Sequence, residues 1–333
     1  MSEKINLYSL TICARATLDL HSLNNEGTEG NQIQTRMVSI LDERGALHSV
    51  NAISGDMWKH IQAEHLFRLS AENGEVPLCA GCRKFDANRI NADHDFQALV
   101  RAKTASRVLL DELLRRCALD DIEGNLITAG SNSLPRKSVV EFGWTVGVPD
   151  YVTTDSHFHV KYARLRDTES IAADREAAEK EGANLNQSIF HRPLSSGIYA
   201  IVTAAEPARI GFNDITQEYA IDDAQRLLRH QLLLESLLYT FLNPRGAMRS
   251  TQYPHLVAFE GVIAFSTAAA PAPTVSPLKA TYREEIVRVH QALEPLRPEA
   301  VTLLPFETLG EFAEHMTALI QQSAPYRLHY QTA

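Results

Sequence analysis

A short stretch around Ser54 carries residue types that could hold a phosphate group. Ser54 and Gly55 stand between an extended run and a run with helical spacing, so Ser54 can cap a helix and Gly55 lets a ligand approach the backbone. Unpaired N–H groups at a helix start attract anions, and Lys59 and His60 fall off the apolar face of this helix. Asp56 would itself neutralise the helix start. The stretch therefore indicates either a phosphate site or an ordinary capped helix.

The polar loop before Ser54 in the sequence could contact a phosphate through its backbone rather than through charged side chains. It contains the asparagines Asn24, Asn25 and Asn31 and the glycines Gly27 and Gly30. Residues of these two types let the main chain approach a phosphate closely. We therefore expect the loop and the Ser54 helix start to act together.

Arginines that follow breaks in the expected elements could supply positive charge. Arg36 begins an extended run, and Arg245 and Arg249 follow the Pro and Gly that end a long apolar helix. Residues 185–194 are expected to form an exposed excursion with Phe190 and Arg192 near its tip. The alternative for Phe190 is a local packing anchor.

Cys79 and Cys82 form a CxxC pair, which is half of a zinc site. The chain has no second CxxC pair, so the tetrahedron would have to be completed by His65, His94 or Cys117. The alternative is a pair of loop thiols. Cys13 and Cys117 lie on an expected strand and helix and are expected in the core.

Apolar periodicity predicts the elements that position these residues. Strands are expected over residues 5–20, 36–41, 46–53, 197–203 and 255–265, and helices over 54–70, 95–119, 171–182, 222–241, 279–293 and 306–322. Residues 268–277 have the composition of a Pro/Ala linker. The order of the main elements is compatible with an α+β fold whose ferredoxin-like βαββαβ core is interrupted by insertions. The same fold carries RNA on a sheet face in RRM modules.

Composition indicates a globular protein. The 333 residues are 44% hydrophobic and 22% charged, without a run of eighteen apolar residues. The first residues lack the charged and apolar regions of a signal peptide, and four cysteines do not make a disulfide framework. We expect a soluble cytoplasmic protein with no membrane partner.

The formal net charge of −9 argues mildly against nucleic-acid binding. The charges are unevenly placed, however. Residues 83–116 contain eight Lys and Arg against five acids, whereas residues 168–185 contain two basic residues against five acids. A basic groove on an acidic body is therefore compatible with the sequence.

Four stretches in this order resemble the CRISPR-associated autoregulator (DevR) family: residues 10–18, 24–31, 51–60 and 243–251. Its members are the repeated backbone subunit (Cas seven) of type I Cascade effector complexes. The resemblance covers roughly residues 5–70 and 195–265, and it matches neither the CxxC segment nor residues 120–185.

The resemblance implies a palm of the RAMP superfamily, RRM-like, made of residues 1–70 and 195–265. Finger and thumb segments would be inserted over 71–194, and a helical C-terminal extension would span 266–333. Copies of the chain would form a filament along one CRISPR RNA, beside the other Cascade subunits, and reach target DNA by way of the guide. The resemblance implies no catalysis and no cofactor.

By the same resemblance, the glycine loop and the Ser54 helix start would face the guide backbone. Arg36, Lys59, Arg245 and Arg249 would neutralise phosphates, and the segment with Phe190 and Arg192 would be the thumb, which displaces guide bases at regular intervals. Base pairing reads sequence in such complexes, so the protein needs backbone contacts rather than base-edge donors.

Two other classes of function remain open. An RNA-cleaving enzyme of the same superfamily could use His21, His60 or the pair His157 and His159 as general acid or base, although no nucleophile and base stand at short spacing. A small-molecule metalloenzyme could use Cys79, Cys82 and His94, but no Glu stands at His-x-Glu spacing before the pair.

Overall fold

The computed structural model describes residues 4–30, 32–128, 133–162 and 187–329. The strands are β1 (Ile5–Leu7), β2 (Ser9–His21), β3 (Asn25–Glu29), β4 (Gln32–Thr35), β5 (Met37–Leu41), β6 (Leu47–Ile53), β7 (Asn125–Ile127), β8 (Leu134–Arg136), β9 (Val140–Phe142), β10 (Thr145–Tyr162), β11 (Gln187–Ala205), β12 (Phe212–Asn213), β13 (Glu218–Tyr219), β14 (His255–Ser266), β15 (Val301–Phe306) and β16 (Ser323–Pro325). The helices are α1 (Gly55–Asn73), α2 (His94–Arg101), α3 (Ser106–Arg116), α4 (Ala118–Glu123), α6 (Asp223–Leu242), α7 (Tyr282–Leu293) and α8 (Leu309–Gln322), with 3-10 turns η1 (Cys82–Lys84), η2 (Arg89–Ala92) and η4 (Pro207–Arg209).

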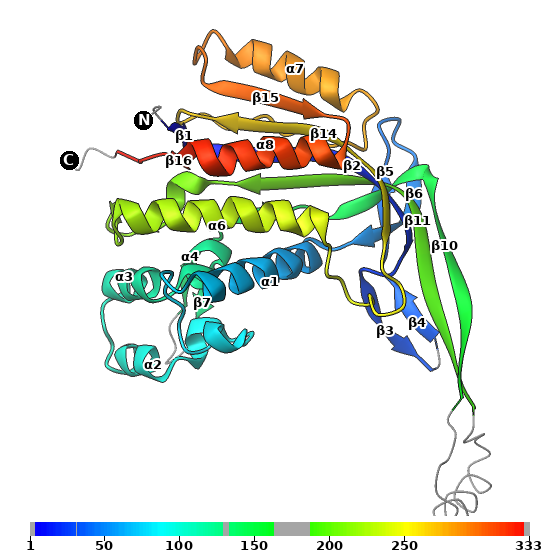
Figure 1. Cartoon of the computed structure of the whole chain (residues 1–333), viewed down its shortest axis with the longest axis horizontal. Helices are drawn as coiled ribbons and strands as arrows, with labels where there is room; N and C mark the ends of the chain where they lie inside the picture. Colours follow the sequence, from blue (N-terminus) through cyan, green and yellow to red (C-terminus); the bar gives the residue numbers. More distant parts are fainter. Residues whose placement is uncertain (1–3, 31, 129–132, 163–186, 330–333) are drawn as a thin grey trace, which may run out of the picture.

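One large sheet organises the part of the chain that the structure describes. Ten of the described strands belong to this sheet. Its main path runs β15-β14-β2-β11-β10-β6-β5, and β3, β4 and β9 pair beside that path. Figure 1 shows α1, α6 and α8 lying along the strands, and α2, α3 and α4 grouped beyond α1. The fold is therefore a mixed helix and sheet fold, as the sequence predicts.

The two faces of β2 pack against different helices because successive residues of a strand point to opposite faces. Leu10, Ile12 and Ala14 belong to the large core that also contains buried residues of α1, α6 and α8. Cys13 points the other way and packs with Tyr282 and Ile286 of α7. Helix α7 therefore covers the opposite face of the sheet from α1, α6 and α8.

The long apolar helix α6 has the bounds that its sequence predicts. Asp222 caps it, accepting a hydrogen bond from the Gln225 N–H at 2.8 Å. Leu233, Leu234 and Leu237 are fully buried, which explains why leucine dominates this stretch. Within the described residues, no helix combines the length and apolarity needed to cross a membrane.

Two regions before residue 120 differ from the predicted elements. The expected loop over 21–34 contains strands β3 and β4, which pair as a hairpin. The single helix expected over 95–119 is divided into α2, α3 and the start of α4, because Lys103 adopts a left-handed conformation (φ 56°) and Cys117 begins a new helix as its N-cap. The expected helix over 171–182 lies outside the described residues.

The expected excursion over 185–194 is instead largely part of strand β11. Phe190 and Arg192 pair with His159 and His157 of β10 in an antiparallel ribbon. Figure 1 shows this ribbon extending away from the helices at the same side of the molecule as β3 and β4. Arg192 is thus held on a strand rather than at the tip of a loop.

The chain after residue 266 was predicted to be helical, and this is wrong in part. It contains α7 and α8, but also β15, which pairs with β14, and β16, which pairs with β1. The Pro/Ala segment 268–277 lies against β2, since the Thr11 hydroxyl donates to the Pro273 carbonyl at 2.8 Å and Arg15 Nε donates to the Pro277 carbonyl at 2.8 Å. Sequence periodicity misses short strands that pair with distant partners.

Candidate nucleic-acid interface and cysteine cluster

Ser54 caps α1, as the sequence predicts. Its side-chain oxygen accepts a hydrogen bond from the Met57 N–H at 3.2 Å, and its own N–H donates to Asn24 Oδ1 at 2.7 Å. Both Ser54 and Asn24 are buried. Asn24 therefore holds the start of the β3–β4 hairpin against the start of α1, and its side chain is not open to a ligand.

The prediction that Gly55 leaves room for a ligand is wrong. A Cβ atom at this position would lie 2.4 Å from the carbonyl oxygen of Phe142 in β9. The backbone that approaches Gly55 is thus the protein's own. With Asp56 exposed in the first turn of α1, the geometry favours an ordinary capped helix over a phosphate site at this helix start.

The β3–β4 hairpin presents open backbone. Gly27 (φ 136°) and Gly30 (φ 60°) are exposed, and a Cβ atom at either would meet nothing within 4 Å. Asn25 is half-buried, and its Oδ1 accepts a hydrogen bond from the Ser22 hydroxyl at 2.8 Å. Asn31 lies outside the described residues. The exposed glycines can bring main-chain groups close to a partner.

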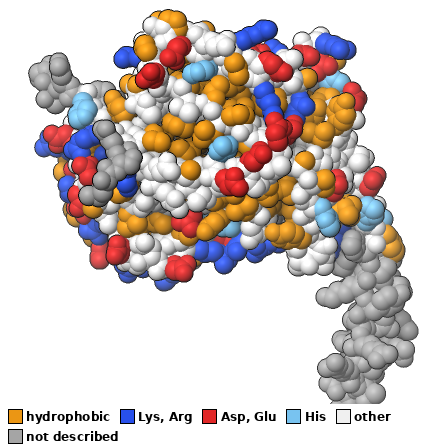
Figure 2. Space-filling view, turned by 45° about the horizontal axis from the view of Figure 1, so that its top comes forward, with side chains coloured by type: hydrophobic (Ala, Val, Ile, Leu, Met, Phe, Trp, Pro, Cys, Tyr) orange, Lys and Arg blue, Asp and Glu red, His pale blue; other side chains and the backbone are white. Residues whose placement is uncertain are grey.

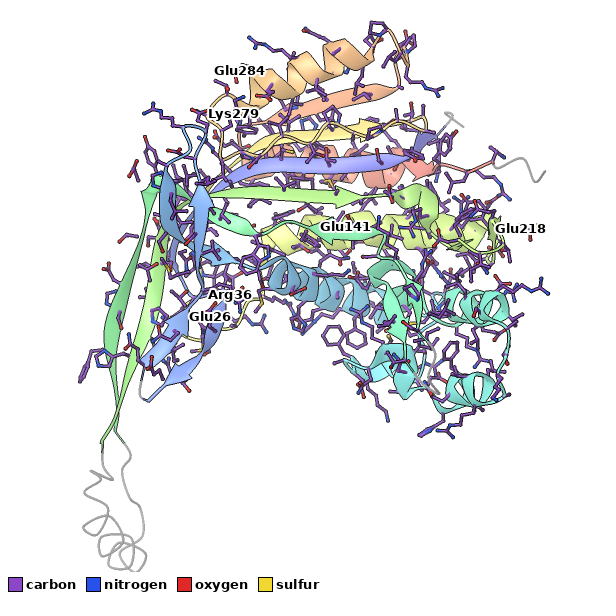
Figure 3. All side chains as sticks on the ribbon, turned by 180° about the vertical axis from the view of Figure 1, so that it is seen from behind. Glu26, Arg36, Glu141, Glu218, Lys279 and Glu284 are labelled. Atoms are coloured by element: carbon purple, nitrogen blue, oxygen red, sulfur yellow. The ribbon has the colours of Figure 1, made fainter. Side chains whose placement is uncertain are left out.

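Arg36 lies at the root of this hairpin between an acid and an aromatic ring. Its Nε is 3.0 Å from Glu26 Oε1, and its Cζ is 5.3 Å from the centroid of the Trp144 ring. Figure 3 shows Arg36 and Glu26 next to each other beside the hairpin strands. The guanidinium remains partly exposed, with its charge partly balanced by Glu26.

The loop after α6 runs beside the start of the hairpin. The Ala247 N–H donates to the Leu23 carbonyl at 2.9 Å, and the Met248 N–H donates to the Ser22 carbonyl at 3.2 Å. A Cβ atom at Gly246 would lie 2.7 Å from the Leu23 carbonyl oxygen, so only glycine permits this contact. Segments separated by more than two hundred residues therefore share one surface.

The two arginines of this loop have different surroundings. Arg245 Nη1 pairs with Glu64 of α1 at 3.2 Å, and the Arg245 side chain is largely buried. Arg249 is exposed. Arg245 thus ties the loop to α1, whereas Arg249 is open to solvent.

The β10–β11 ribbon is joined to the same loop. Arg192 Nη1 donates to the Thr251 hydroxyl at 3.0 Å, and Gln252 Nε2 donates to the Pro193 carbonyl at 3.1 Å. The side chain of Phe190 lies outside the described part of the structure. The hairpin, the start of α1, the loop after α6 and the ribbon are thus joined by hydrogen bonds, and three of these four segments overlap stretches that resemble the family.

Lys59 and His60 lie apart from that meeting point, in a pocket of about 300 Å³ between α1 and the segment after it. Lys59 Nζ donates to the Ser138 hydroxyl at 2.7 Å, and burial lowers the pKa of Lys59. His60 is exposed, with its ring 5.6 Å from that of Phe85. Arg89 also lines the pocket.

Charges of both signs are interspersed over the surface in Figure 2, where hydrophobic side chains occupy much of the middle of the view. The face drawn there carries no continuous basic field. On this face, binding of a polyanion would depend on individually placed arginines and open backbone rather than on a broad potential.

Three of the histidines proposed for a nuclease, His21, His60 and His157, lie on three different elements. His21 is 2% exposed, and burial lowers its pKa to about 4, so it stays neutral near pH 7 and is closed to a surface substrate. His60 is on α1, whereas His157 is exposed on β10. The side chain of His159 lies outside the described residues.

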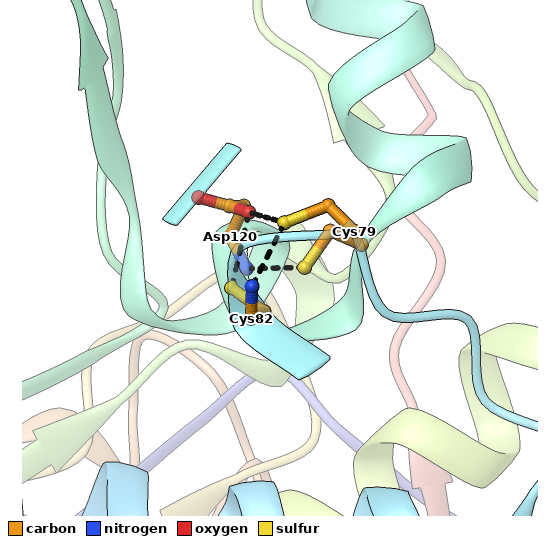
Figure 4. A group of neighbouring side chains, drawn as sticks. Cys79, Cys82 and Asp120 are labelled. Atoms are coloured by element: carbon orange, nitrogen blue, oxygen red, sulfur yellow. Dashed lines mark hydrogen bonds between the residues drawn. The ribbon is translucent and has the colours of Figure 1, made fainter. Parts of the chain in front are cut away.

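Cys79 lies in the loop after α1 and Cys82 begins η1, and both side chains are buried. They meet Cys117 and Asp120, and one ligand atom from each of the four lies within 4.8 Å of the others. Figure 4 shows the Cys79 and Cys82 sulfurs turned toward the Asp120 carboxylate. Hydrogen bonds from the Cys117 and Cys82 thiols lower the pKa of Cys79 to about 5, while burial raises that of Asp120.

Sequence reasoning named Cys117 both as a core residue and as one candidate to complete the CxxC pair, and it missed Asp120. His65 does not join the cluster, because its Nε2 is 3.0 Å from the Asn243 carbonyl oxygen. His94 also lies outside the group. A signal for Asp120 was present, since Cys117 and Asp120 repeat the i, i+3 spacing of Cys79 and Cys82.

A match along most of the sequence decides the family. The model of DevR, the CRISPR-associated negative auto-regulator DevR/Csa2, matches residues 12–287. The chain belongs to this family. The DevR match begins in β2 and ends in α7, so it contains the Asn24–Ser54 bond, the loop after α6 and the cysteine cluster. No curated protein matches the chain at the level taken as significant.

Three solved structures are similar to this DevR chain along most of its length. A chain of a "CRISPR RNA-guided surveillance complex, pre-nicking" is 14% identical with a TM-score of 0.48, and the match covers 96% of each chain. A chain of a "CRISPR RNA-guided surveillance complex" is 12% identical with a TM-score of 0.45, covering 94% of this chain and 98% of that one. Csc2 of Thermofilum pendens is 11% identical with a TM-score of 0.37, covering 95% and 85%.

Proposed function

We propose that this DevR family member is a backbone subunit of a type I CRISPR Cascade effector complex that binds guide RNA and does not cleave it. Its partners would be the CRISPR RNA, further copies of itself along that RNA, the other Cascade subunits, and target DNA by way of the guide. Membership of a CRISPR-associated family supports the setting. The local geometry supports the role within it.

An RRM-like palm within the large sheet is part of this proposal. The strands β14, β2, β11 and β9 are neighbours in that order, and each pair is antiparallel. Helix α1 follows β2 and α6 follows β11 in the chain. This is the strand order 4-1-3-2 with two helices that a ferredoxin-like βαββαβ unit requires. It supports a palm made of parts of residues 1–70 and 195–265 together with β9, which lies within the segment 71–194.

The observation that carries the proposal is the meeting of four distant segments at one side of that palm. The bonds Asn24–Ser54, Leu23–Ala247 and Arg192–Thr251 join the hairpin, α1, the loop after α6 and the ribbon. A catalytic site would gather titratable groups at such a point. This one gathers open glycine backbone and arginines instead, which suits a phosphate backbone.

Within this surface we assign contact with RNA to the exposed and the partly exposed members. These are the backbone at Gly27 and Gly30 and the side chains of Arg36, Arg192 and Arg249. Asn24, Ser54, Gly55 and Arg245 hold the surface in shape. Lys59 and His60 would contact RNA separately, from the pocket between α1 and the segment after it. Sequence recognition would come from base pairing, so few base-edge donors are needed.

The competing function is an endoribonuclease of the same superfamily. Burial of His21 as a neutral imidazole disfavours it, because a general acid or base must reach the proton that it transfers. Exposed His60 and His157 stand on separate elements. We therefore assign no catalytic residue.

The nucleic acid that co-purifies with the chain tests the proposal. The chain is expressed in a host that transcribes a matching repeat array, purified at low salt, and extracted. RNA that carries repeat sequence is the expected result, and doubly substituted Arg36→Ala, Arg249→Ala protein should retain less of it. Arg288→Ala on α7, also an exposed arginine, is the matched control and should retain as much as the wild type. Recovery of no RNA, or of random fragments at equal amounts in all three proteins, would reject the function.

A further inference from the structure

The cysteine cluster is built from two segments that lie close together. Cys79 and Cys82 flank the turn that leads into η1, while Cys117 is the N-cap of α4 and Asp120 lies in the first turn of that helix. The Ala118 N–H donates to the Pro77 carbonyl at 2.9 Å, which holds the two segments together just outside the cluster. The RNA surface described above uses none of the four side chains.

We propose that one zinc ion is bound by four buried side chains, those of Cys79, Cys82, Cys117 and Asp120. All four are at most 3% exposed. Three sulfurs and one carboxylate oxygen form a ligand set of the type and number that zinc takes in structural sites, where no position is left open. The ions Mg²⁺ and Ca²⁺ take oxygen ligands, so three sulfurs exclude them.

The spacing of the ligand atoms fits a tetrahedron. With Zn–S bonds of about 2.3 Å and Zn–O bonds of about 2.1 Å, neighbouring ligand atoms are separated by roughly 3.6 to 3.8 Å. The Asp120 Oδ2 lies 3.4 Å from Cys79 Sγ and 3.5 Å from Cys82 Sγ. All four ligand atoms lie within 4.8 Å of one another, so small side-chain rotations suffice to bring them to one ion.

The groups around the cluster prepare the ligands for a cation. The Cys82 N–H donates to Cys79 Sγ at 3.3 Å, and the Asp120 N–H donates to Cys117 Sγ at 3.5 Å, contacts that favour thiolates. Asn125 Nδ2 donates to Asp120 Oδ1 at 2.7 Å and leaves Oδ2 facing the sulfurs. A second shell of this kind orients metal ligands.

The turn between Cys79 and Cys82 requires glycine at position 81. A Cβ atom at Gly81 would lie 2.0 Å from the Arg89 carbonyl oxygen. The Ala80 N–H donates to Asp93 Oδ2 at 2.9 Å, which anchors the turn from its other side. The two sulfurs of the CxxC pair are therefore positioned by the backbone before any ion binds.

Zinc would join the loop after α1 to α4 and so fix the helical segment that lines the Lys59 pocket. On binding, any protons that the three thiols and the Asp120 carboxyl still hold pass to solvent, and three Zn–S bonds and one Zn–O bond form without any change of oxidation state. The inference is independent of RNA binding, because a structural ion here would serve any function of the chain.

The metal content of the intact chain tests this proposal. Protein produced in zinc-supplemented medium and purified without chelator should contain about one zinc per chain by mass spectrometry. After chelation under reducing conditions it should take up about one Co²⁺, with the sulfur-to-cobalt absorption of a tetrahedral thiolate site. Zinc content should fall to below about one tenth of an equivalent in Cys82→Ser and Asp120→Asn and persist in Asp120→Cys, which restores a metal ligand.

Cys13→Ser is the control, since Cys13 is also buried but packs with α7 on the other face of the sheet. It should keep the full equivalent of zinc. Wild-type protein that holds no zinc and takes up neither Zn²⁺ nor Co²⁺ would overturn the proposal, as would iron in place of zinc or a disulfide between Cys79 and Cys82. Because these outcomes concern the wild type, they do not depend on whether a variant folds.

Discussion

The side chain of Asn24 accepts a hydrogen bond from the backbone N–H of Ser54 at 2.7 Å, joining residues thirty positions apart. The bond links the loop after β2 to the start of α1. The β3–β4 hairpin lies between these two points in the sequence. The Asn24 carbonyl also accepts the Thr35 hydroxyl at 3.3 Å where the hairpin returns. One asparagine thus sets where the exposed glycines stand relative to α1.

Asn24→Ala should destabilise the fold, because the buried N–H of Ser54 would lose its acceptor. We expect a loss of about 1–3 kcal/mol in the free energy of unfolding, measured by urea denaturation. Asn24→Asp keeps an acceptor oxygen and should lose less. Equal losses in the two variants would show that the amide contributes through something other than this bond.

Arg249→Ala should weaken RNA binding without loss of stability, because Arg249 is exposed. The slope of log affinity against log salt should become shallower by about 0.7 on single-stranded RNA, the value for one lost phosphate contact. Fluorescence anisotropy over a salt series measures it. An unchanged slope and affinity would remove Arg249 from the RNA surface.

Arg245→Ala should give the opposite pattern. Its pairing with Glu64 at 3.2 Å is largely buried, so the free energy of unfolding should fall by about 1 kcal/mol or more. The salt slope should stay within error of the wild type. A shallower slope at unchanged stability would mean that Arg245 leaves Glu64 to contact phosphate.

Glu26→Gln should strengthen RNA binding. Glu26 pairs with Arg36 at 3.0 Å, and both side chains are partly exposed. Pairs of this kind are worth about 0.2–1 kcal/mol, so releasing Arg36 should raise affinity by up to about fivefold at low salt. The gain should disappear in the Arg36→Ala background; a gain that persists there would assign the effect to net charge alone.

Glu123→Gln should change how stability depends on pH. Burial raises the pKa of Glu123 from 4.5 to about 7, so the folded state holds a proton that the unfolded chain has already released between these values. Its contribution to stability is complete below about pH 4.5 and is lost as pH rises to about 7, a change of about 3 kcal/mol. The variant should therefore gain stability over the wild type at pH 8 but not at pH 4.5.

Urea unfolding at several pH values measures this difference. Subtracting the wild-type free energy of unfolding from that of the variant at each pH cancels the contributions of the other titrating groups. Glu141→Gln is the matched control, because Glu141 is an exposed acid on β9. A difference curve as flat for Glu123→Gln as for Glu141→Gln would show that Glu123 is charged in the folded state.

Local features of the chain were predictable from sequence. The Ser54 and Asp222 caps, the buried leucines of α6 and the strands on either side of the Asp42 turn follow from neighbouring residues alone. The family resemblance rested on four stretches, and the match over residues 12–287 confirms it.

Other features depend on contacts between distant residues. Gly55 looks like a ligand-binding glycine until Phe142 is placed against it, and Arg245 looks free until Glu64 is found beside it. Strands β3 and β15 show no regular alternation of buried and exposed residues, and they are set by their pairing with β4 and β14. The i, i+3 spacing of Cys117 and Asp120 is a sequence signal, but it does not show that this pair lies beside Cys79 and Cys82, which depends on the packing of α4 next to η1.

The most direct test of the central claim is to incubate the purified chain with labelled repeat-spacer RNA and to measure binding and RNA length in the same sample. The account predicts a shift to larger complexes in discrete steps as protein is added, with the RNA recovered at full length. The Arg36→Ala, Arg249→Ala double variant should need more protein to reach the same shift, and Arg288→Ala should not. Cleavage of the RNA by wild-type protein, or no shift at low salt, would contradict the account.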